Sequence, residues 1–384
     1  MANSLKRVIP VVAFLTCALL CFSGTASRDG KQSTHESGAG LSKWKAHDYS
    51  VDGYVGSTAC AECHAALVSA QESTPMAHSM ELAANCKILI SNPKLTYRNG
   101  PFVYQITRQG DRSIYTVTDG ASTISEPILS CFGEGVAGQT YLFRHRGVLY
   151  ESRVSYYPAI RNLDITILHP RSVPSSIESA IGRPMTLEAS EGCFDCHSTT
   201  SSDSSGLRLD SLIPGITCER CHGPGSKHVA AMKSKDFGNP NIFNPGSLDS
   251  LDQNQEFCGF CHQGFEKVME LEDHGGIENV RFQPYRMFKS RGHLVDDPRI
   301  GCIACHDPHN HLKREAGFYD SKCFACHLSN SDEKQTGQRS APPCPVAAAS
   351  CVTCHMPKVE LPEMHFKFTD HWIRIVRPNE PVPK

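Results

Sequence analysis

The chain has 384 residues, with 38 Lys and Arg against 40 Asp and Glu, and its formal net charge is −2. This balance gives no argument for a basic surface, so we expect no nucleic-acid partner. The unusual feature of the composition is its 19 cysteines and 19 histidines, which point to metal, disulfide or prosthetic-group chemistry.

Residues 1–26 have the pattern of an export signal peptide. Lys6 and Arg7 precede an apolar run over residues 8–22, and Gly24 and Ala26 supply small residues at the spacing a signal peptidase needs. The run is shorter than the ~20 residues that span a bilayer, and an uncleaved anchor is the alternative. Residues 27–50 are polar and predict a flexible leader. We therefore expect an exported, periplasmic protein.

A pentapeptide, Cys-x-x-Cys-His, first appears after this leader and then recurs through the chain. Its seven cysteine pairs are Cys60 and Cys63, Cys193 and Cys196, Cys218 and Cys221, Cys258 and Cys261, Cys302 and Cys305, Cys323 and Cys326, and Cys351 and Cys354. The histidines that follow them are His64, His197, His222, His262, His306, His327 and His355. The pentapeptide is the attachment site of a c-type haem: each thiol forms a thioether, and the histidine is the proximal iron ligand.

Chance, zinc and disulfide chemistry fit the motif less well. Random placement of these residue types gives only roughly 0.05 such pentapeptides per chain. Structural zinc sites join two ligand pairs into one tetrahedral set, whereas each unit here has its own histidine. A disulfide framework leaves the repeated histidine unexplained. We therefore predict seven covalent haem c groups.

The predicted organisation follows the spacing of the motifs. Residues 51–91 form an N-terminal haem segment, with a helix over residues 60–70. Residues 92–170 form a small antiparallel β insertion, because residues 102–107 and 113–118 alternate apolar and polar around a Gly-containing turn. Residues 141–144 and 148–151 predict a second hairpin in the same way. A structural cover or docking platform is the expected role of this insertion, and a substrate pocket is the alternative.

Residues 171–384 form a six-haem array and a C-terminal tail. Its six sites lie within residues 193–355, and about 27 residues per haem are too few for each site to build its own core. We expect stacked porphyrins wrapped by short helices and loops, one of them over residues 228–232. The fold class is thus a multihaem cytochrome c with a small β insertion. Some Lys and Arg residues should pair with haem propionates.

The sixth iron position decides between a carrier and a catalyst, because a second side-chain ligand saturates the iron. Of the 19 histidines, seven belong to the motifs and twelve do not. The candidate distal ligands are His78, His228, His309, His371, His365 and His293. For His145, His169, His274 and His311 we favour a solvent-exposed position or a propionate contact. Methionines more often pack than ligate, so bis-histidine ligation and low reduction potentials are expected.

Several short signatures resemble the multihaem cytochromes c of the cytochrome c-552/4 type. They are residues 54–57 before Cys60, residues 218–228, residues 302–309 and residues 354–358. The resemblance implies a periplasmic electron-transfer protein with closely stacked haem pairs, and it assigns His78, His228 and His309 to distal positions. Broader relatives include enzymes that act on nitrite, hydroxylamine or tetrathionate. The nitrite reductase type uses a Cys-x-x-Cys-Lys haem, and this sequence has no such motif.

Three cysteines past the signal lie outside the motifs. Cys86 and Cys131 bracket much of the predicted insertion, and a disulfide between them suits an oxidising compartment. Cys344, between two prolines, is then a lone thiol with no assigned role.

Two functions from different classes follow. The first, which we favour, is an electron carrier between redox partner proteins, one of them a membrane quinol oxidoreductase; membrane contact arises through that partner or an uncleaved anchor. The second is an oxidoreductase in which the haem at Cys60 or at Cys193 keeps an open iron. Arg144, Arg146 and Arg153 would then attract a nitrogen or sulfur oxyanion, although a solvated β surface is the simpler role for them.

Overall fold

The computed structural model describes residues 53–203, 206–271, 276–290, 300–325, 327 and 344–377. All of them belong to one compact unit, Ser37–Lys384. The predicted signal peptide and leader lie outside the described residues. Within the part of the chain that is described, no helix is both long and apolar enough to cross a membrane.

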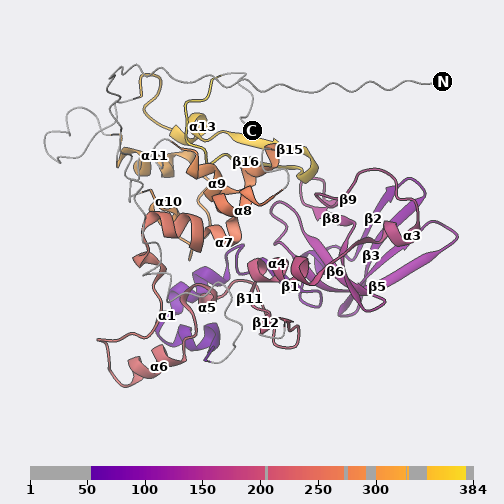
Figure 1. The fold of residues 1–384 in the computed structure, drawn as a ribbon, viewed down its shortest axis with the longest axis horizontal. Helices are drawn as coiled ribbons and strands as arrows, with labels where there is room; N and C mark the ends of the chain where they lie inside the picture. The colour runs from indigo at the N-terminus through magenta and orange to yellow at the C-terminus, as the bar shows by residue number, and fades with distance from the viewer. Residues whose placement is uncertain are drawn as a thin grey trace, which may run out of the picture. The chain divides into compact units, whose positions relative to one another are not determined.

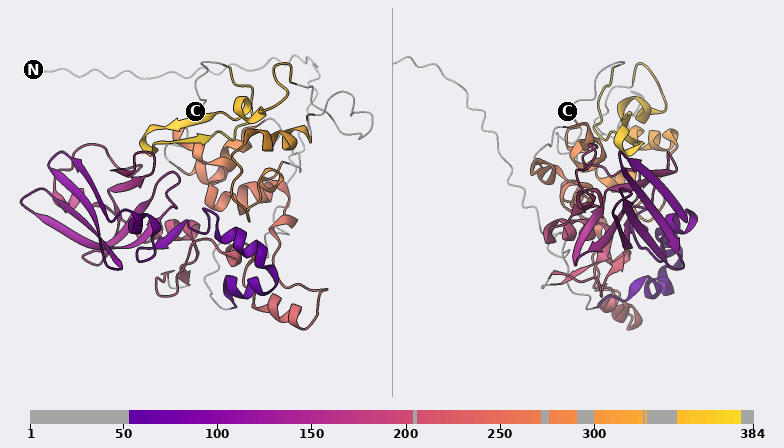
Figure 2. Two further views of the ribbon diagram at one scale, coloured as in Figure 1. Left: turned by 180° about the vertical axis from the view of Figure 1, so that it is seen from behind. Right: turned by 90° about the vertical axis from the view of Figure 1, so that its right-hand side faces the viewer.

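An eight-stranded antiparallel sheet forms the largest ordered element (Figure 1). Its strand order is β10-β7-β6-β5-β4-β3-β2, and β1 pairs with β5 outside this path. The strands are β1 (Met80–Leu82), β2 (Lys94–Asn99), β3 (Phe102–Gln109), β4 (Arg112–Thr118), β5 (Thr123–Phe132), β6 (Thr140–His145), β7 (Val148–Ser152) and β10 (Gly182–Pro184). β3 pairs with β4 and β4 with β5, and Figure 2 shows the sheet that they belong to from behind.

Both predicted hairpins are present. β3 and β4 pair from Val103 with Thr118 to Gln109 with Arg112, and β6 and β7 pair around Arg146 and Gly147. Alternation in β3 matches its burial, since every second residue from Phe102 to Ile106 is buried. This period of two places one side of the hairpin in the core and the other toward solvent.

The prediction of a small insertion over residues 92–170 is wrong in extent. The sheet begins at Met80 and ends at Pro184, because two three-residue strands join it at β5 and β7. Gly182 makes the second pairing sterically possible, since a Cβ at this position would lie 2.0 Å from the Glu151 carbonyl oxygen. Such short strands carry no recognisable alternation, so the sequence pattern did not detect them.

A core of aliphatic and aromatic side chains lies against the sheet. It includes Tyr104, Tyr115 and Phe143, all of which are fully buried. The β8 (Val154–Tyr157) and β9 (Asn162–Ile165) hairpin, together with α2 (Lys87–Ser91) and α3 (Ile177–Ala180), contributes to the same cluster. A second cluster, which includes Met80, Phe132 and Phe194, joins the sheet to the first motif of the array.

The motif-bearing segments consist of short helices, as predicted. They are α1 (Gly56–Glu72), α4 (Leu187–His197), α5 (Cys218–His222), α6 (Ser226–Lys233), η3 (Asp252–Phe257, a π-helix), α7 (Gly259–His262), α8 (Phe265–Met269), η4 (Ile277–Arg281), α9 (Gln283–Phe288), α10 (Cys302–Cys305), α11 (Ala316–Phe324) and α13 (Cys351–His355). The remaining described elements are two short turns and three two-stranded pairs. The turns are η2 (Pro245–Ser247) and η6 (Pro362–Met364). The pairs are β11 (Ser198–Thr200) with β14 (Ile213–Pro214), β12 (Ser202–Asp203) with β13 (Gly206–Leu207), and β15 (Lys358–Leu361) with β16 (Phe366–Thr369).

Candidate haem-attachment sites

Each motif lies on or at the end of a short helix. Helices α1, α4, α5, α7, α10, α11 and α13 carry the seven motifs in chain order. One helical turn brings the two thiols and the following imidazole to neighbouring positions, which the attachment chemistry requires. Cys326 lies outside the described residues, so the structure describes the sixth motif only through Cys323 and His327.

Three motif histidines face a histidine from a distant part of the chain. The ring centroids of His64 and His228 are 6.4 Å apart, with an angle of 18° between the ring planes. His222 and His309 are separated by 6.0 Å at 17°. His306 and His371 are separated by 6.2 Å at 44°. Each pair joins one motif histidine to one candidate distal histidine.

These spacings fit two imidazoles that share one iron ion. A metal–imidazole bond is about 2.0 Å, and the ring centre lies about 1 Å behind the bonding nitrogen, so two rings on opposite sides of one ion have centroids about 6 Å apart. The observed separations fall within 0.4 Å of one another in three unrelated segments. The side chains present therefore fit a bis-histidine haem at each of these three positions.

Hydrogen bonds orient several of these rings through Nδ1. His197 donates to the Ser79 carbonyl at 2.9 Å, His222 to Phe243 at 2.9 Å and His355 to Arg374 at 2.9 Å. Among the partner histidines, His228 donates to Pro240 at 2.7 Å and His371 to Thr369 at 3.0 Å. A proton held on Nδ1 leaves Nε2 available as the ligand atom, and the carbonyl fixes the ring orientation.

Burial favours the neutral, metal-binding form of five histidine rings. It lowers the pKa of the ring in four motif histidines and in His371, where the value falls to about 4. The four motif residues are His197, His222, His262 and His306. In each case the cause is the cost of placing a charged ring in a poorly solvated site.

Buried polar side chains connect one motif to the next. Glu219 lies between the two cysteines of the third motif and is 3% exposed. Its carboxylate accepts hydrogen bonds from the amides of Val55 at 2.8 Å and Gly56 at 2.9 Å, at the start of α1. It also accepts one from Gly225 at 2.8 Å. An anion at a helix N-terminus is favourable, so Glu219 fixes the first motif helix beside the third.

The same arrangement recurs further along the chain. Asp320 on α11 accepts from the amides of Ser350 at 2.7 Å and Cys351 at 2.9 Å, at the start of α13. The buried Asn254 on η3 accepts from the amide of Cys302 at 2.9 Å, at the start of α10. These contacts connect the sixth motif to the seventh, and the fourth to the fifth.

Cysteines of different motifs also lie against one another. The contact between Cys196 and Cys261 raises the pKa of Cys196, and the corresponding contact between Cys258 and Cys302 raises the pKa of Cys258. Burial, with a contribution from Cys218, raises the pKa of Cys60 to about 11. Motif helices that are separated in sequence are therefore neighbours in the fold.

The other predicted distal ligands are placed differently. His78 contacts Lys87 Nζ at 3.3 Å and Glu81 at 3.4 Å. His365 hydrogen-bonds Asp164 at 2.8 Å, and within the described residues neither ring pairs with a motif histidine. His293 and His274 lie outside the described residues. His145 and His169 pair with Glu126 and Glu151, while His311 is exposed.

The three arginines that we considered as an oxyanion-binding site share no contact partner within the described residues. Arg144 donates to the Gly147 carbonyl at 3.1 Å, within its own hairpin. Arg153 is 5% exposed and donates to the carbonyls of Pro170 and Ser172, both at 2.7 Å. Arg146 lies in the turn between β6 and β7 with a positive φ of 49°. The hydrogen bonds of Arg144 and Arg153 to backbone carbonyls are structural contacts.

Cys86 and Cys131 lie together in the sheet core. Both are fully buried free thiols, and the Cys86 thiol donates to Gln139 Oε1 at 3.0 Å. Hydrogen bonding to Cys131 lowers the pKa of Cys86. The structure thus brings together the two residues of the predicted disulfide. Cys344 is exposed.

The residues that join the motifs could not be found from the sequence. Glu219 occupies one of the two unspecified positions of its pentapeptide, and Asn254 and Asp320 lie in helical segments that have no distinctive sequence pattern. The available signal was an acidic residue between the two cysteines of the third motif, but Glu62 has a similar place in the first motif and is exposed. Only the tertiary contacts distinguish the two.

Comparisons with known proteins agree with this picture. A family model described as cytochrome c554 and c-prime matches residues 168–223, which contain the second and third motifs. This match and the repeated motifs support a multihaem c-type cytochrome. The chain is 24% identical over 152 residues to the multiheme cytochrome MtrA of Shewanella baltica (strain OS185), an alignment that covers 38% of this chain and 37% of that protein. The chain therefore spans less than two fifths of this relative's length.

A solved structure is also similar to the chain. It is the crystal structure of the outer cell wall cytochrome OcwA, with 16% identity and a TM-score of 0.44, and the match covers 84% of this chain and 80% of that one.

Proposed function

We propose that the chain is an exported heptahaem c-type cytochrome that carries electrons between redox partner proteins. The pairing of three motif histidines with three distant histidines at 6.0–6.4 Å supports this proposal most strongly. Haem c supplies a one-electron redox centre at each attachment site. The chain's own residues attach, ligate and bury these groups.

The proposed distal ligands are His228 for the first site, His309 for the third and His371 for the fifth. Each comes from outside the motif that it completes, so folding and ligation depend on each other. Saturated iron favours transfer of electrons over binding of substrate. His78, His365 and His293 stay predicted ligands for the other sites, although the contacts of His78 and His365 with charged side chains favour them less.

The connections between motifs support a carrier. Glu219 joins the first and third motif helices, Asn254 the fourth and fifth, and Asp320 the sixth and seventh. The Cys196–Cys261 contact joins the second to the fourth. Close neighbours are what electron transfer between successive centres requires, and no substrate pocket is needed for it.

Mass and spin state test this proposal. Intact-mass measurement of secreted protein should give the processed polypeptide plus seven haems. Ferric electron paramagnetic resonance should show low-spin iron that is unchanged by cyanide, nitrite or hydroxylamine. A high-spin signal that shifts with those ligands would favour the oxidoreductase instead, and a polypeptide without added haem would refute both functions.

Single variants test the ligand assignments. His228→Ala, His309→Ala and His371→Ala should each convert one of the seven haems from low to high spin, because each removes one axial ligand while leaving both thioethers. His145→Ala is the matched control, since its ring contacts Glu126 in the sheet, and it should leave the spectrum unchanged. An unchanged spectrum in any of the three would remove that histidine from the ligand set.

A further inference from the structure

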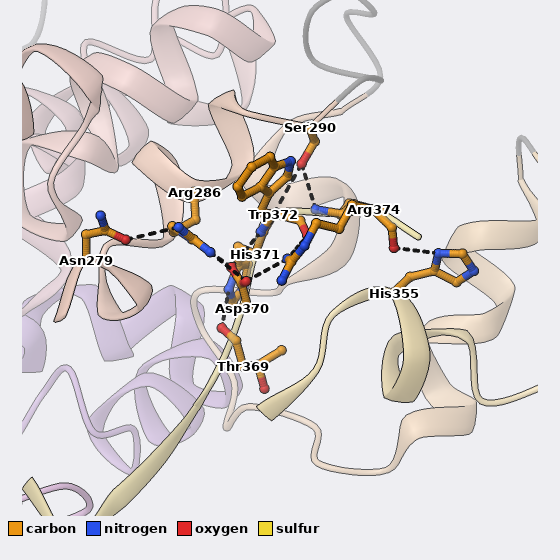
Figure 3. A network of polar contacts seen from close by, with 10 residues as sticks. Asn279, Arg286, Ser290, His355, Thr369, Asp370, His371, Trp372 and Arg374 are labelled. Atoms are coloured by element: carbon orange, nitrogen blue, oxygen red, sulfur yellow. Dashed lines mark hydrogen bonds and ion pairs between the residues drawn. The ribbon is translucent and has the colours of Figure 1, made fainter. Parts of the chain in front are cut away.

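One short segment near the C-terminus lies beside histidines of two different attachment sites, and Figure 3 shows its contact with one of them, His355. It carries His371, whose ring lies 6.2 Å from that of His306. Three residues further on, the Arg374 carbonyl accepts the Nδ1 proton of His355 at 2.9 Å. Residues 370–374 therefore contain the partner of the fifth motif histidine and the hydrogen-bond acceptor of the seventh.

A buried ion pair holds this segment. Arg286 and Asp370 are both completely buried, and the Arg286 guanidinium donates to the two carboxylate oxygens at 2.8 Å and 2.7 Å. Arg374 Nη1 donates to the same carboxylate at 2.7 Å. Asn279 Oδ1 accepts from Arg286 at 3.1 Å, which fixes the guanidinium from behind.

Backbone contacts hold the segment from two further sides. The Ile373 amide donates to Ser290 Oγ at 2.8 Å, next to α9. On the side of α13, the Asp370 amide donates to the Pro357 carbonyl at 3.0 Å and the Arg374 amide to the His355 carbonyl at 3.3 Å. The segment thus bridges α9 and the seventh motif.

Positively charged side chains outnumber carboxylates around the Trp372 ring of this segment. Arg286, Arg374 and Lys289 all lie within 5.5 Å of the Trp372 ring, and Asp370 is the carboxylate bound between the two arginines. In a poorly solvated interior each of these charges acts strongly on its surroundings. Asp370 therefore sets both the position of the segment and the local charge balance.

We propose that Asp370 and Arg286 are a pair of positioning residues that control the ligand geometry and the reduction potential of two haem sites together, the fifth and the seventh. The proposal rests on the haem ligation given under the proposed function. Its basis is that one buried carboxylate anchors both His371 and the acceptor of His355. Other acid–arginine pairs of the described chain, such as Glu151 with Arg183, lack this double connection.

Opposite charge changes give the proposal a directional test. Asp370→Asn removes a buried negative charge, so an added electron is more favourable, and the potentials at the fifth and seventh sites should rise. Arg286→Gln removes a positive charge, so the potentials of the same two sites should fall. Breaking a buried pair also destabilises the fold, but damage alone would not give shifts of opposite sign.

The experiment is a spectroelectrochemical titration of both holoprotein variants, with electron paramagnetic resonance of the ferric state. Two of the seven components should shift in each variant and the other five should not. Glu126→Gln is the matched control, because Glu126 is a partly buried carboxylate paired with His145 on the sheet, and it should shift no component. The double variant Asp370→Asn with Arg286→Gln should return the two potentials toward those of the natural protein.

Several outcomes would overturn the proposal. Shifts of the same sign in both single variants would mean general damage, and a shift confined to one component would mean that the two sites are independent. If either single variant fails to fold, Arg374→Lys, which keeps the charge but loses the planar contact to Asp370, supplies the same two-component readout. Absence of low-spin haem in the natural protein would refute the proposed function itself, a result distinct from unchanged potentials in variants that carry seven low-spin haems.

Discussion

The sheet and the motif-bearing segments are stabilised in different ways. The sheet buries a continuous apolar cluster in which Tyr104, Tyr115 and Phe143 are fully enclosed. The apolar cluster described for the later motifs consists of Val280, Val359 and Leu361 with two partly buried neighbours. Buried residues among the motifs are instead often polar: Glu219, Asp252, Gln253, Asn254, Asn279, Arg286, Asp320 and Asp370.

This difference indicates what each region needs in order to fold. A sheet with its own apolar core gains stability from burial alone. Short helices joined by hydrogen bonds do not bury enough apolar surface to offset the loss of chain entropy. The motif-bearing segments therefore need the apolar faces of the covalently attached groups, and the polar contacts select which motifs become neighbours.

The largest expected effect comes from removing one attachment site. Replacing both Cys302 and Cys305 by Ala should sharply lower the yield of mature holoprotein, because one apolar group is then missing from between neighbouring motifs. The proteolytic resistance of the sheet over residues 80–184 should persist. Cys344→Ala is the control, since that exposed cysteine belongs to no motif. Normal yield of the double variant would contradict the dependence on haem.

Removing a large side chain from the sheet core should destabilise the sheet and leave the haem sites unchanged. Phe143 is fully buried and contacts Tyr115, with ring centroids 5.1 Å apart. Phe143→Ala should lower the free energy of unfolding of the sheet by about 3–5 kcal/mol, while the low-spin spectrum below the unfolding transition stays the same. Circular dichroism during denaturant titration measures the first and absorbance the second.

The matched control for this variant is Phe237→Ala, because that side chain is 71% exposed. Its effect should be within about 0.5 kcal/mol. A loss of haem ligation in Phe143→Ala at low denaturant would show that the two regions do not have separate sources of stability.

Prediction from the sequence succeeded where the pattern is local and failed where a partner is distant. The hairpins at 102–118 and 141–151 were predictable from alternation and turn residues, whereas β1 and β10 were too short to carry a pattern. His228, His309 and His371 were named as candidates, but nothing in the sequence gives their partners. His64 and His228, for example, are 164 residues apart and meet only through the fold.

A smaller effect is expected from the contact that joins the first and third motifs. Glu219→Gln keeps the size of the side chain but replaces one of its two acceptor oxygens by an NH₂ group, so at least one of the three backbone N–H donors loses its acceptor. Leaving a buried donor unsatisfied in this way should cost about 1–3 kcal/mol. Hydrogen exchange at the Val55 and Gly56 amides should accelerate, and mass spectrometry of the corresponding peptide measures it.

An exposed acidic residue of the first motif serves as the control. Glu62 also lies between two motif cysteines, but it is 61% exposed and its carboxylate lies 3.5 Å from Lys233 Nζ. Glu62→Gln should change stability by less than about 0.5 kcal/mol and should leave the exchange of Val55 and Gly56 as it is. Equal effects of the two variants would mean that Glu219 has no special role in joining the motifs.

The smallest effect concerns the acid stability of the β8–β9 hairpin, which shares the core of the sheet. Burial raises the pKa of Asp164, but hydrogen bonds from Arg171 and His365 outweigh this cost, and the pKa is lower than that of an ordinary aspartate. A carboxyl group with a lowered folded-state pKa stabilises the fold fully above its unfolded value, about 3.9, and loses that contribution as the pH falls toward the folded value. The β8–β9 hairpin and the core that it shares with the sheet should therefore lose stability below about pH 4, and Asp164→Asn should remove this part of the pH dependence. Thermal unfolding followed at several pH values measures both, and an unchanged slope in the variant would mean that other carboxylates cause the acid loss.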